Sequence, residues 1–217
     1  IALWKAKDII ASKWRWLLID LDRGFDRRRL GLNSIEFFTT ANGWKGVNPP
    51  WATLFLRKLL NNQEFKALFI SKLSDYLFTT LHPITINNKI SVFKEQLENE
   101  IPFHINRWKG TSSKYGDAIP TLDYWNNQVE SLRYFANRRN DIVRNDLIKY
   151  FNLEKAVSLN IQNIDKNRGQ IKINKLIIAE NNWKGKYISG IPLTFTAIPK
   201  EGYKFSHWEG ISRMIDS

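Results

Sequence analysis

Apolar residues recur every three or four positions over much of the first 150 residues, a spacing that predicts amphipathic helices. The third of these helices contains Pro102, which should kink or split it. A short helical segment is also expected over residues 3–10. We expect the apolar stripes to form the core of a helical lobe built on four main helices, over residues 50–60, 64–81, 90–108 and 122–150.

The hydrophobic pattern changes near Leu153, where alternation with period two replaces the helical spacing. This alternation predicts half-buried strands over residues 157–161, 171–173 and 191–199. We therefore place a boundary near residue 154, between a lobe over residues 1–153 and a small β-rich module over residues 154–217. The predicted fold class is α+β.

Two carboxylates follow a short apolar run near the start of the chain. Residues 16–19 read as a buried strand, which ends in Asp20 and Asp22 and then Gly24. Paired carboxylates at the end of a strand can hold Mg²⁺, which prefers hard oxygen ligands and bridges to substrate phosphates. Residues 23–50 are rich in Gly and Pro, and predict a long excursion with little regular structure that is expected to be functional.

The Asp-Leu-Asp motif belongs to a longer series of spaced motifs that resembles the CotH (spore coat protein H) kinase-like family over roughly residues 1–153. The residues that carry the resemblance are Trp14-Arg15-Trp16, Asp20-Leu21-Asp22, Gly24-Phe25, Asn48-Pro49-Pro50, the segments 59–66 and 69–70, His104–Trp108, and Leu132–Arg139.

The resemblance implies the mostly helical C-terminal lobe of a divergent protein-kinase-like fold that transfers the γ-phosphate of ATP to Ser or Thr of an acceptor protein. It also implies that Asp20 and Asp22 hold Mg²⁺ or Mn²⁺ beside the phosphates. The residue that accepts the acceptor hydroxyl proton is expected upstream of Ile1. The sequence contains no Gly-rich phosphate loop, so these 217 residues alone are expected to be catalytically inactive.

The C-terminal segment looks like a small β repeat of bacterial surface proteins, of the internalin type. The resemblance rests on Leu193–Pro199 followed by Gly202-Tyr203, Phe205 and Trp208-Glu209-Gly210. In that pattern the aromatic residues are core residues. The module is expected to be truncated or completed further on, and the family and the repeat together imply a secreted or cell-surface protein.

Composition narrows the chemistry. The chain contains no Cys, which excludes disulfides, thiol catalysis and Cys-ligated zinc, and its three His residues lack metal-ligand spacing. No apolar run is long enough to span a membrane, and no signal peptide is present in the sequence. The net charge of +12 favours anionic partners. Nucleic acid ranks low among these, because no motif of a known binding module accompanies the charge.

Several polar residues outside the Asp-Leu-Asp motif remain open. Arg139 falls on the apolar stripe of the last helix, so it must reach solvent, pair with an acid or bind a ligand. His104 and Arg107 are more simply explained as structural residues, and the run Arg27–Arg29 as a solvated loop. A second function also stays open, in which the lobe has lost activity and serves as a surface adhesion or glycan-binding module. Exposed tryptophans such as Trp44 and Trp183 would then stack on sugars.

Overall fold

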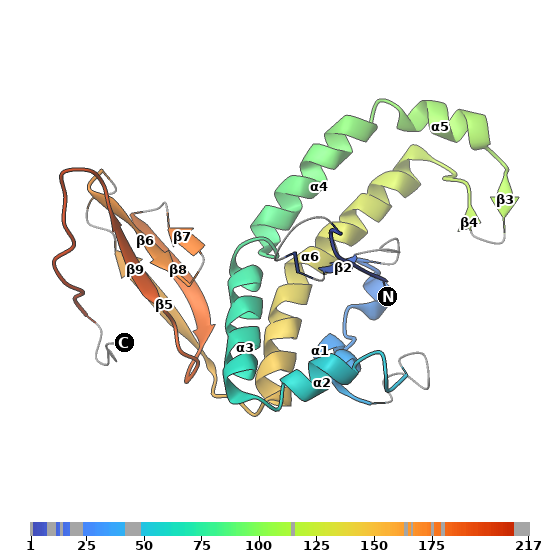
Figure 1. Cartoon of the computed structure of the whole chain (residues 1–217). Helices are drawn as coiled ribbons and strands as arrows, with labels where there is room; N and C mark the ends of the chain where they lie inside the picture. The colour runs from blue at the N-terminus through green and yellow to red at the C-terminus, as the bar shows by residue number, and fades with distance from the viewer. Residues whose placement is uncertain are drawn as a thin grey trace.

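The computed structural model confirms the predicted α+β class, with 47% of the chain helical and 17% in strands. It describes residues 2–7, 12–13, 15–17, 24–41, 49–113, 116–162, 165, 167–174, 176–178 and 181–210. The helical part comes first in the chain and small antiparallel sheets follow it (Figure 1).

The helical part is arranged around one long helix, α6. Its companion α4 lies beside the N-terminal half of α6, and α3 lies beside the C-terminal half (Figure 1). The short helices α1 and α2 lie at the lower end of α6 in this view. The helices are α1 (Ser34–Thr39), α2 (Leu54–Leu59), α3 (Gln63–Phe78), α4 (Pro83–Leu97), α5 (Ile101–Trp108) and α6 (Leu122–Tyr150).

Capping residues in the sequence explain where these helices begin. The side chain of Asn62 accepts a hydrogen bond from the Phe65 amide at 2.9 Å, and that of Thr121 accepts one from the Tyr124 amide at 3.1 Å. His82 caps α4, with Pro83 at its first position. The last helix therefore has the bounds predicted from its apolar stripe, Leu122–Tyr150.

The predicted helix over residues 90–108 is two helices. It starts earlier than expected, at Pro83, because His82 and Pro83 form a helix start. The helix before it ends sooner than the predicted residue 81, at Phe78 with Thr79 as its C-cap. The chain then breaks between Leu97 and Ile101, and Pro102 lies in the first turn of α5, where a missing amide hydrogen costs little. The arm formed by α4, α5 and α6 ends in a hairpin of β3 (Ser112–Ser113) and β4 (Gly116–Asp117) (Figure 1).

The chain after α6 forms two small antiparallel sheets. One pairs β5 (Ala156–Gln162) with β8 (Asn182–Ile188), and the other has the order β7-β6-β9. Their inner faces meet in a core of Ile173, Ile178 and Tyr187. The remaining strands are β6 (Gly169–Ile173), β7 (Leu176–Ile178) and β9 (Phe195–Pro199).

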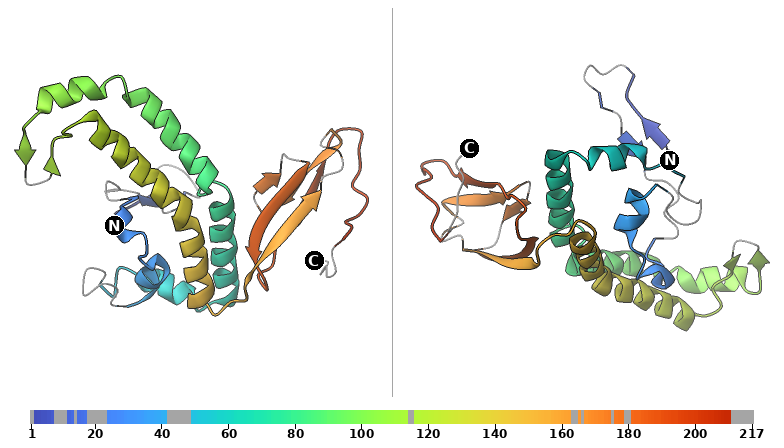
Figure 2. Two further views of the ribbon diagram at one scale, coloured as in Figure 1. Left: turned by 180° about the vertical axis from the view of Figure 1, so that it is seen from behind. Right: turned by 90° about the horizontal axis from the view of Figure 1, so that it is seen from below.

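The end of strand β8 reaches into the helical part. Ile188 is 3% exposed and shares a core cluster with Ile35 of α1, Ile70 of α3 and Leu147 of α6. Views from behind and from below show the sheets lying against α3 (Figure 2). One core cluster of the helical part therefore includes a residue from beyond the change from helices to strands.

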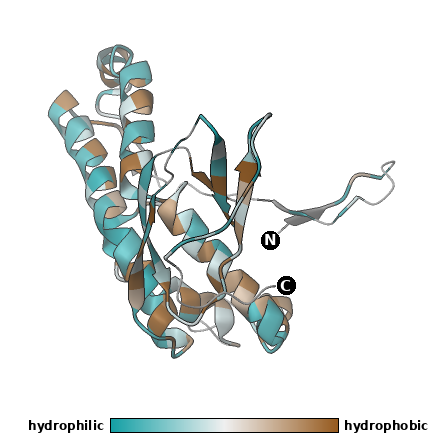
Figure 3. Cartoon of the chain, turned by 90° about the vertical axis from the view of Figure 1, so that its left-hand side faces the viewer, coloured by the Kyte–Doolittle hydropathy of each residue, from teal (hydrophilic) through white to brown (hydrophobic). Residues whose placement is uncertain are grey.

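Several local expectations for the first fifty residues are wrong. The expected helical segment at residues 3–10 begins instead with a strand, β1 (Ala2–Trp4), which pairs antiparallel with β2 (Arg15–Leu17). This ribbon projects away from the rest of the molecule (Figure 3). The expected strand over residues 16–19 thus coincides with β2 up to Leu17, and its remainder lies outside the described residues. The excursion over residues 23–50 also holds the 3-10 helix η1 (Arg27–Arg29) and α1.

Not every predicted apolar stripe is core. Phe55 of α2 and Trp51 in the turn before it are 69% and 71% exposed, and Phe93 on the arm is 61% exposed. The helical periodicity is correct, but the described residues leave these side chains largely uncovered. In the β part, Tyr203 and Phe205 are exposed as well, whereas Trp208 packs against Phe195 with ring centroids 6.0 Å apart.

Candidate functional site beside the Asp-Leu-Asp segment

Asp20 and Asp22, the predicted metal ligands, lie outside the described residues. The described chain ends at Leu17 on β2 and resumes at Gly24, two residues after Asp22. The structure therefore leaves their position untested and shows instead how the chain that follows them is held.

Phe25 fixes the beginning of this following segment. Its backbone has φ of 60°, a conformation that costs free energy for a side chain without a local hydrogen bond. Its ring lies against Phe135 of α6, with centroids 5.2 Å apart. The next residue, Asp26, accepts hydrogen bonds from the amide and the guanidinium of Arg28, at 3.0 and 3.1 Å, and so caps η1. These bonds hold the pKa of Asp26 below its ordinary value.

Arg139 of α6 fixes the far end of the same segment. It lies within the apolar stripe of α6, where it was expected to reach solvent, pair with an acid or bind a ligand, but its direct partners are a backbone carbonyl and a hydroxyl. Its guanidinium donates to the carbonyl of Leu30 and to the hydroxyl of Ser34, both at 2.6 Å. Burial lowers the pKa of Arg139, and the carboxylate of Asp146 partly offsets this shift. Arg139 is thus a structural anchor for residues 30–34.

Asp146 is the carboxylate that interacts electrostatically with Arg139 from two turns further along α6. Its Oδ2 atom is buried and has no hydrogen-bond partner among the described residues. Burial raises the pKa of Asp146, while Arg139 and Lys149 act in the opposite direction. The charged form of Asp146 is therefore stabilised by Arg139 and Lys149 at a distance, but no described residue donates a hydrogen bond to its Oδ2 atom.

Two arginines, Arg27 and Arg138, make cation–π contacts with the same tyrosine ring, that of Tyr134. The Cζ of Arg27, on η1, lies 4.2 Å from the ring centroid of Tyr134, and the Cζ of Arg138 lies 3.8 Å from it. Tyr134 and Arg138 share a face of α6 because they are four residues apart. They line a hollow of 520 Å³ together with Asn127, Glu130, Ser131, Arg133 and Asn137.

The other residues singled out in the sequence do not join this site. His104 and Arg107 are exposed on α5, and Arg107 lies over the ring of Trp108 at 5.3 Å. His82 is a helix cap. Within the described part of the chain, no group of three or more His, Asp or Glu side chains is placed to hold a metal.

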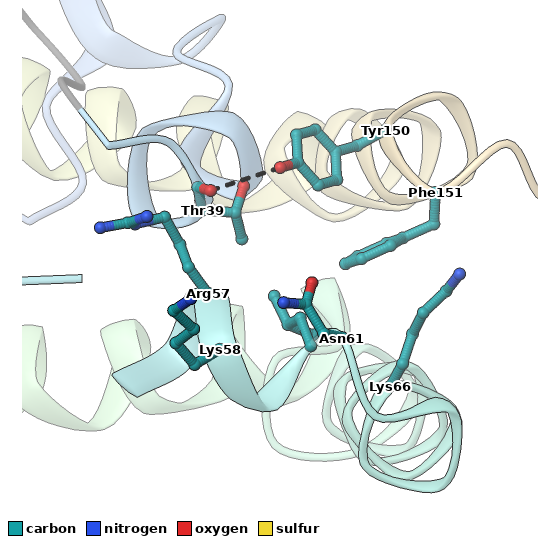
Figure 4. A pocket seen from close by; sticks show the side chains of 8 residues that line it. Thr39, Arg57, Lys58, Asn61, Lys66, Tyr150 and Phe151 are labelled. Atoms are coloured by element: carbon teal, nitrogen blue, oxygen red, sulfur yellow. Dashed lines mark hydrogen bonds between the residues drawn. The ribbon is translucent and has the colours of Figure 1, made fainter. Parts of the chain in front are cut away.

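A second hollow, of 340 Å³, lies at the C-terminal end of α6 (Figure 4). Its basic residues are Arg57, Lys58 and Lys66, and Tyr150 closes one side by donating to the Thr39 carbonyl at 3.4 Å. Arg57 is already bonded to the Pro50 carbonyl at 2.7 Å. Since Tyr134 and Tyr150 are sixteen residues apart on one helix, about 24 Å separates the two hollows.

The family of the chain follows from comparison with known proteins. A family model described as CotH kinase protein matches residues 1–143. The match covers well over half of the chain, so the chain belongs to the CotH kinase protein family. No curated protein and no solved structure matches the chain.

One contact in the structure, which was not predicted from the sequence, joins two segments that carry the family resemblance. Two of the segments that carry the family resemblance are Asp20–Phe25 and Leu132–Arg139, and the structure places Phe25 of the first against Phe135 of the second. The contacts of Arg27 and Arg138 with Tyr134 were not predicted, because a short basic run such as Arg27–Arg29 is more typical of a solvated loop. The available signal was the spacing of an arginine four residues after Tyr134.

Proposed function

We propose that this chain is part of an atypical protein kinase in which Asp20 and Asp22 hold a divalent metal ion beside the phosphates of ATP. Membership of a family of kinase proteins is the observation that carries the proposal. The donor set fits the metal, since two carboxylates one residue apart in the sequence supply hard oxygen ligands, and Mg²⁺ keeps its remaining positions for water and phosphate. The bound metal would neutralise charge on the β- and γ-phosphates.

In the proposed reaction, the bond between the γ-phosphorus and the bridging oxygen of ADP breaks, and a new bond forms to a Ser or Thr hydroxyl of the acceptor protein. The hydroxyl proton passes to a base that we place upstream of Ile1. Within this chain, α6 has a positioning role, because Phe135 and Arg139 hold both ends of the segment that follows Asp22. By themselves these 217 residues are proposed to be inactive.

Two further proposals concern the β part and the location. We propose that residues 154–217 form a small module related to internalin-type repeats, supported by the two facing sheets and by Trp208 packed on Phe195. The family's association with the spore coat supports a surface or secreted location. No helix among the described residues is long and apolar enough to cross a bilayer.

The test is ATP binding by calorimetry in Mg²⁺ or Mn²⁺, on the protein extended upstream of Ile1. The Asp20→Ala/Asp22→Ala variant should lose binding, as should the wild type after chelation. Glu95→Ala, which removes an exposed carboxylate from α4, is the matched control and should bind normally. Normal metal-dependent binding by the double variant would rule out these aspartates as the metal ligands.

The alternative function is an inactive lobe that serves as a surface interaction module, binding a protein or a glycan. Exposed aromatic residues support it, above all Trp51 and Phe103, at 71% and 72% exposure. Trp183 does not, because it is partly buried between the sheets and packs against Phe78 with ring centroids 5.9 Å apart. Trp44 lies outside the described residues. A folded wild-type protein that binds no nucleotide would favour this alternative.

A further inference from the structure

We propose that the hollow around Tyr134 binds a phosphoryl group carried by a peptide segment of the acceptor protein, with Arg27 and Arg138 as its ligands. Both arginines are exposed, and they come from different elements, η1 and α6. The partner would thus be a peptide that already carries a phosphate near the residue to be modified.

The spacing of the two guanidinium groups is the first argument. Each Cζ lies about 4 Å from the same ring centre, so the two are no more than about 8 Å apart. One phosphoryl group offers three acceptor oxygens, and two exposed arginine side chains stacked on one ring can extend their terminal N–H groups past its edge to form charge-assisted hydrogen bonds with that group.

The local charge is the second argument. Asp26 pairs with Arg28 and Arg29, and Glu130 pairs with Arg133. No carboxylate among the described residues forms an ion pair with Arg27 or Arg138. These two like charges therefore repel each other, and a dianion bound beside both of them relieves the repulsion more than a single carboxylate would.

The organisation of the hollow is the third argument. Tyr134 is a positioning residue, since its ring holds both guanidinium groups by cation–π contacts before any ligand arrives. Arg133 is held from α4, where it donates to the Asn87 carbonyl at 3.2 Å and to the Ser91 hydroxyl at 3.0 Å. The hollow, at 520 Å³, is larger than a phosphate ion and has neutral amides and a hydroxyl around it, which suits a peptide.

This inference deepens the proposed function: that the peptide is an acceptor rests on phosphoryl transfer by the complete kinase. That the two arginines bind a phosphoryl group does not rest on it. The test is therefore run on the 217-residue chain without nucleotide or metal, so that its outcome is independent of the ATP-binding experiment.

The experiment is a fluorescence-anisotropy titration of a fluorescein-labelled Gly/Ser peptide containing one phosphoserine, beside the same peptide with serine or glutamate at that position. We expect the phosphopeptide to bind at least tenfold more tightly than the serine peptide, with the glutamate peptide between them. Arg27→Gln and Arg138→Gln should each weaken phosphopeptide binding roughly tenfold, and the double variant should abolish the preference.

Matched controls separate a site from general positive charge. Arg107→Gln removes an exposed charge from α5 and should not change binding by more than about twofold. Tyr134→Phe keeps the ring and should bind normally, whereas Tyr134→Leu keeps both charges and should weaken binding several-fold. Circular dichroism of each variant verifies that it is folded.

Three results would overturn the proposal. Equal affinity for the phosphoserine and serine peptides would show that no phosphoryl group is recognised. An equal loss in Arg107→Gln would show a non-specific charge effect. Competition by inorganic phosphate at the same concentration as the phosphopeptide would indicate an ion site without a peptide partner.

Discussion

The phenol oxygen of Tyr187, on β8, lies 3.1 Å from Oδ1 of Asp75, on α3. Asn174 joins the same carboxylate, since its side-chain amide donates to Asp75 at 3.1 Å and to the Ser71 hydroxyl at 2.9 Å. Tyr187 is 2% exposed. A buried polar contact therefore links the helical part to the sheets, beside the apolar contact made by Ile188.

Removing the hydroxyl from this contact should destabilise the protein. Tyr187→Phe keeps the ring that stacks on Phe78 at 5.5 Å but leaves Asp75 one donor short, at an expected cost of about 1–2 kcal/mol. Asn174→Asp should cost more, because it replaces two donors with a second negative charge. Urea unfolding followed by circular dichroism measures both. Wild-type stability in Tyr187→Phe would mean that this hydrogen bond contributes nothing net.

The same contact predicts how stability depends on pH. Burial raises the pKa of Asp75 above its ordinary 3.8, despite the donors from Asn174 and Tyr187. Between pH 3.8 and this raised pKa, native Asp75 keeps a proton that the unfolded state has released. The stability that Asp75 contributes is therefore complete below pH 3.8, and it is lost as pH rises through the pKa of native Asp75. Burial and Asp75 likewise raise the pKa of Tyr187 above 10, so its contribution is lost only in stronger alkali.

Substitutions separate the contribution of Asp75 to the pH dependence of stability from the contributions of other acidic residues. Asp146 acts in the same direction as Asp75, because burial raises its pKa as well. Asp26 acts in the opposite direction, since its lowered pKa gives stability that is lost as pH falls. Asp75→Asn should therefore remove part of the decline in unfolding free energy above pH 4, and Asp146→Asn a further part. An unchanged slope in Asp75→Asn would contradict the assignment.

The long helices were predictable from sequence because their capping residues and their apolar stripes indicate the same helices. Thr121 and Asn62 cap α6 and α3, and Pro102 divides the third helical segment as expected. The missed strands are those whose pattern is weak. β7 has three residues, and β8 contains Lys184, Gly185 and Lys186, so neither offers a clear alternation.

Burial and the candidate site were less predictable, for physical reasons. Periodicity shows which face of α2 is apolar, but it cannot show whether a partner covers Trp51. The hollow around Tyr134 needs Arg27 and Arg138 side by side, although they are more than a hundred residues apart in the chain. Only the fold brings η1 to α6. The metal-binding role of Asp20 and Asp22 stays a prediction from the family resemblance.

A buried amide on α6 should be among the most sensitive polar positions. Asn140 is 6% exposed and donates to the carbonyls of Leu77 and Leu81, at 2.5 and 3.0 Å, while its oxygen accepts from Arg144. Asn140→Ala removes the donor to both carbonyls and the acceptor for one Arg144 nitrogen, which keeps its ion pair with Asp141, at an expected cost of about 2–4 kcal/mol. Asn145→Ala, exposed on the same helix, should change stability by less than about 0.5 kcal/mol. Equal effects of the two in urea unfolding would contradict this role.

A glycine in β8 is required by a neighbouring ring. A Cβ at Gly185 would lie 2.1 Å from the Trp183 side chain, so Gly185→Ala must displace that ring from its contact with Phe78. We expect a loss of about 1–3 kcal/mol and a changed near-ultraviolet circular dichroism spectrum. Gly31→Ala, where a Cβ meets nothing within 4 Å, is the control. An unaltered spectrum in Gly185→Ala would mean that the ring has room to move.

The shared core predicts that the sheets stabilise the helices. Ile188→Ala removes a side chain that packs with Ile70 and Leu147, at an expected cost of about 2–4 kcal/mol. Because that cluster belongs to the helical part, the loss should appear in the helical signal at 222 nm, as a lower midpoint of a single transition. Ile177→Ala, half exposed on β7, should have little effect. If Ile188→Ala leaves the midpoint of the helical transition unchanged, the parts on either side of residue 154 unfold independently. If the midpoint falls, the two parts unfold as one cooperative unit, and the boundary near residue 154 is only a change of secondary structure.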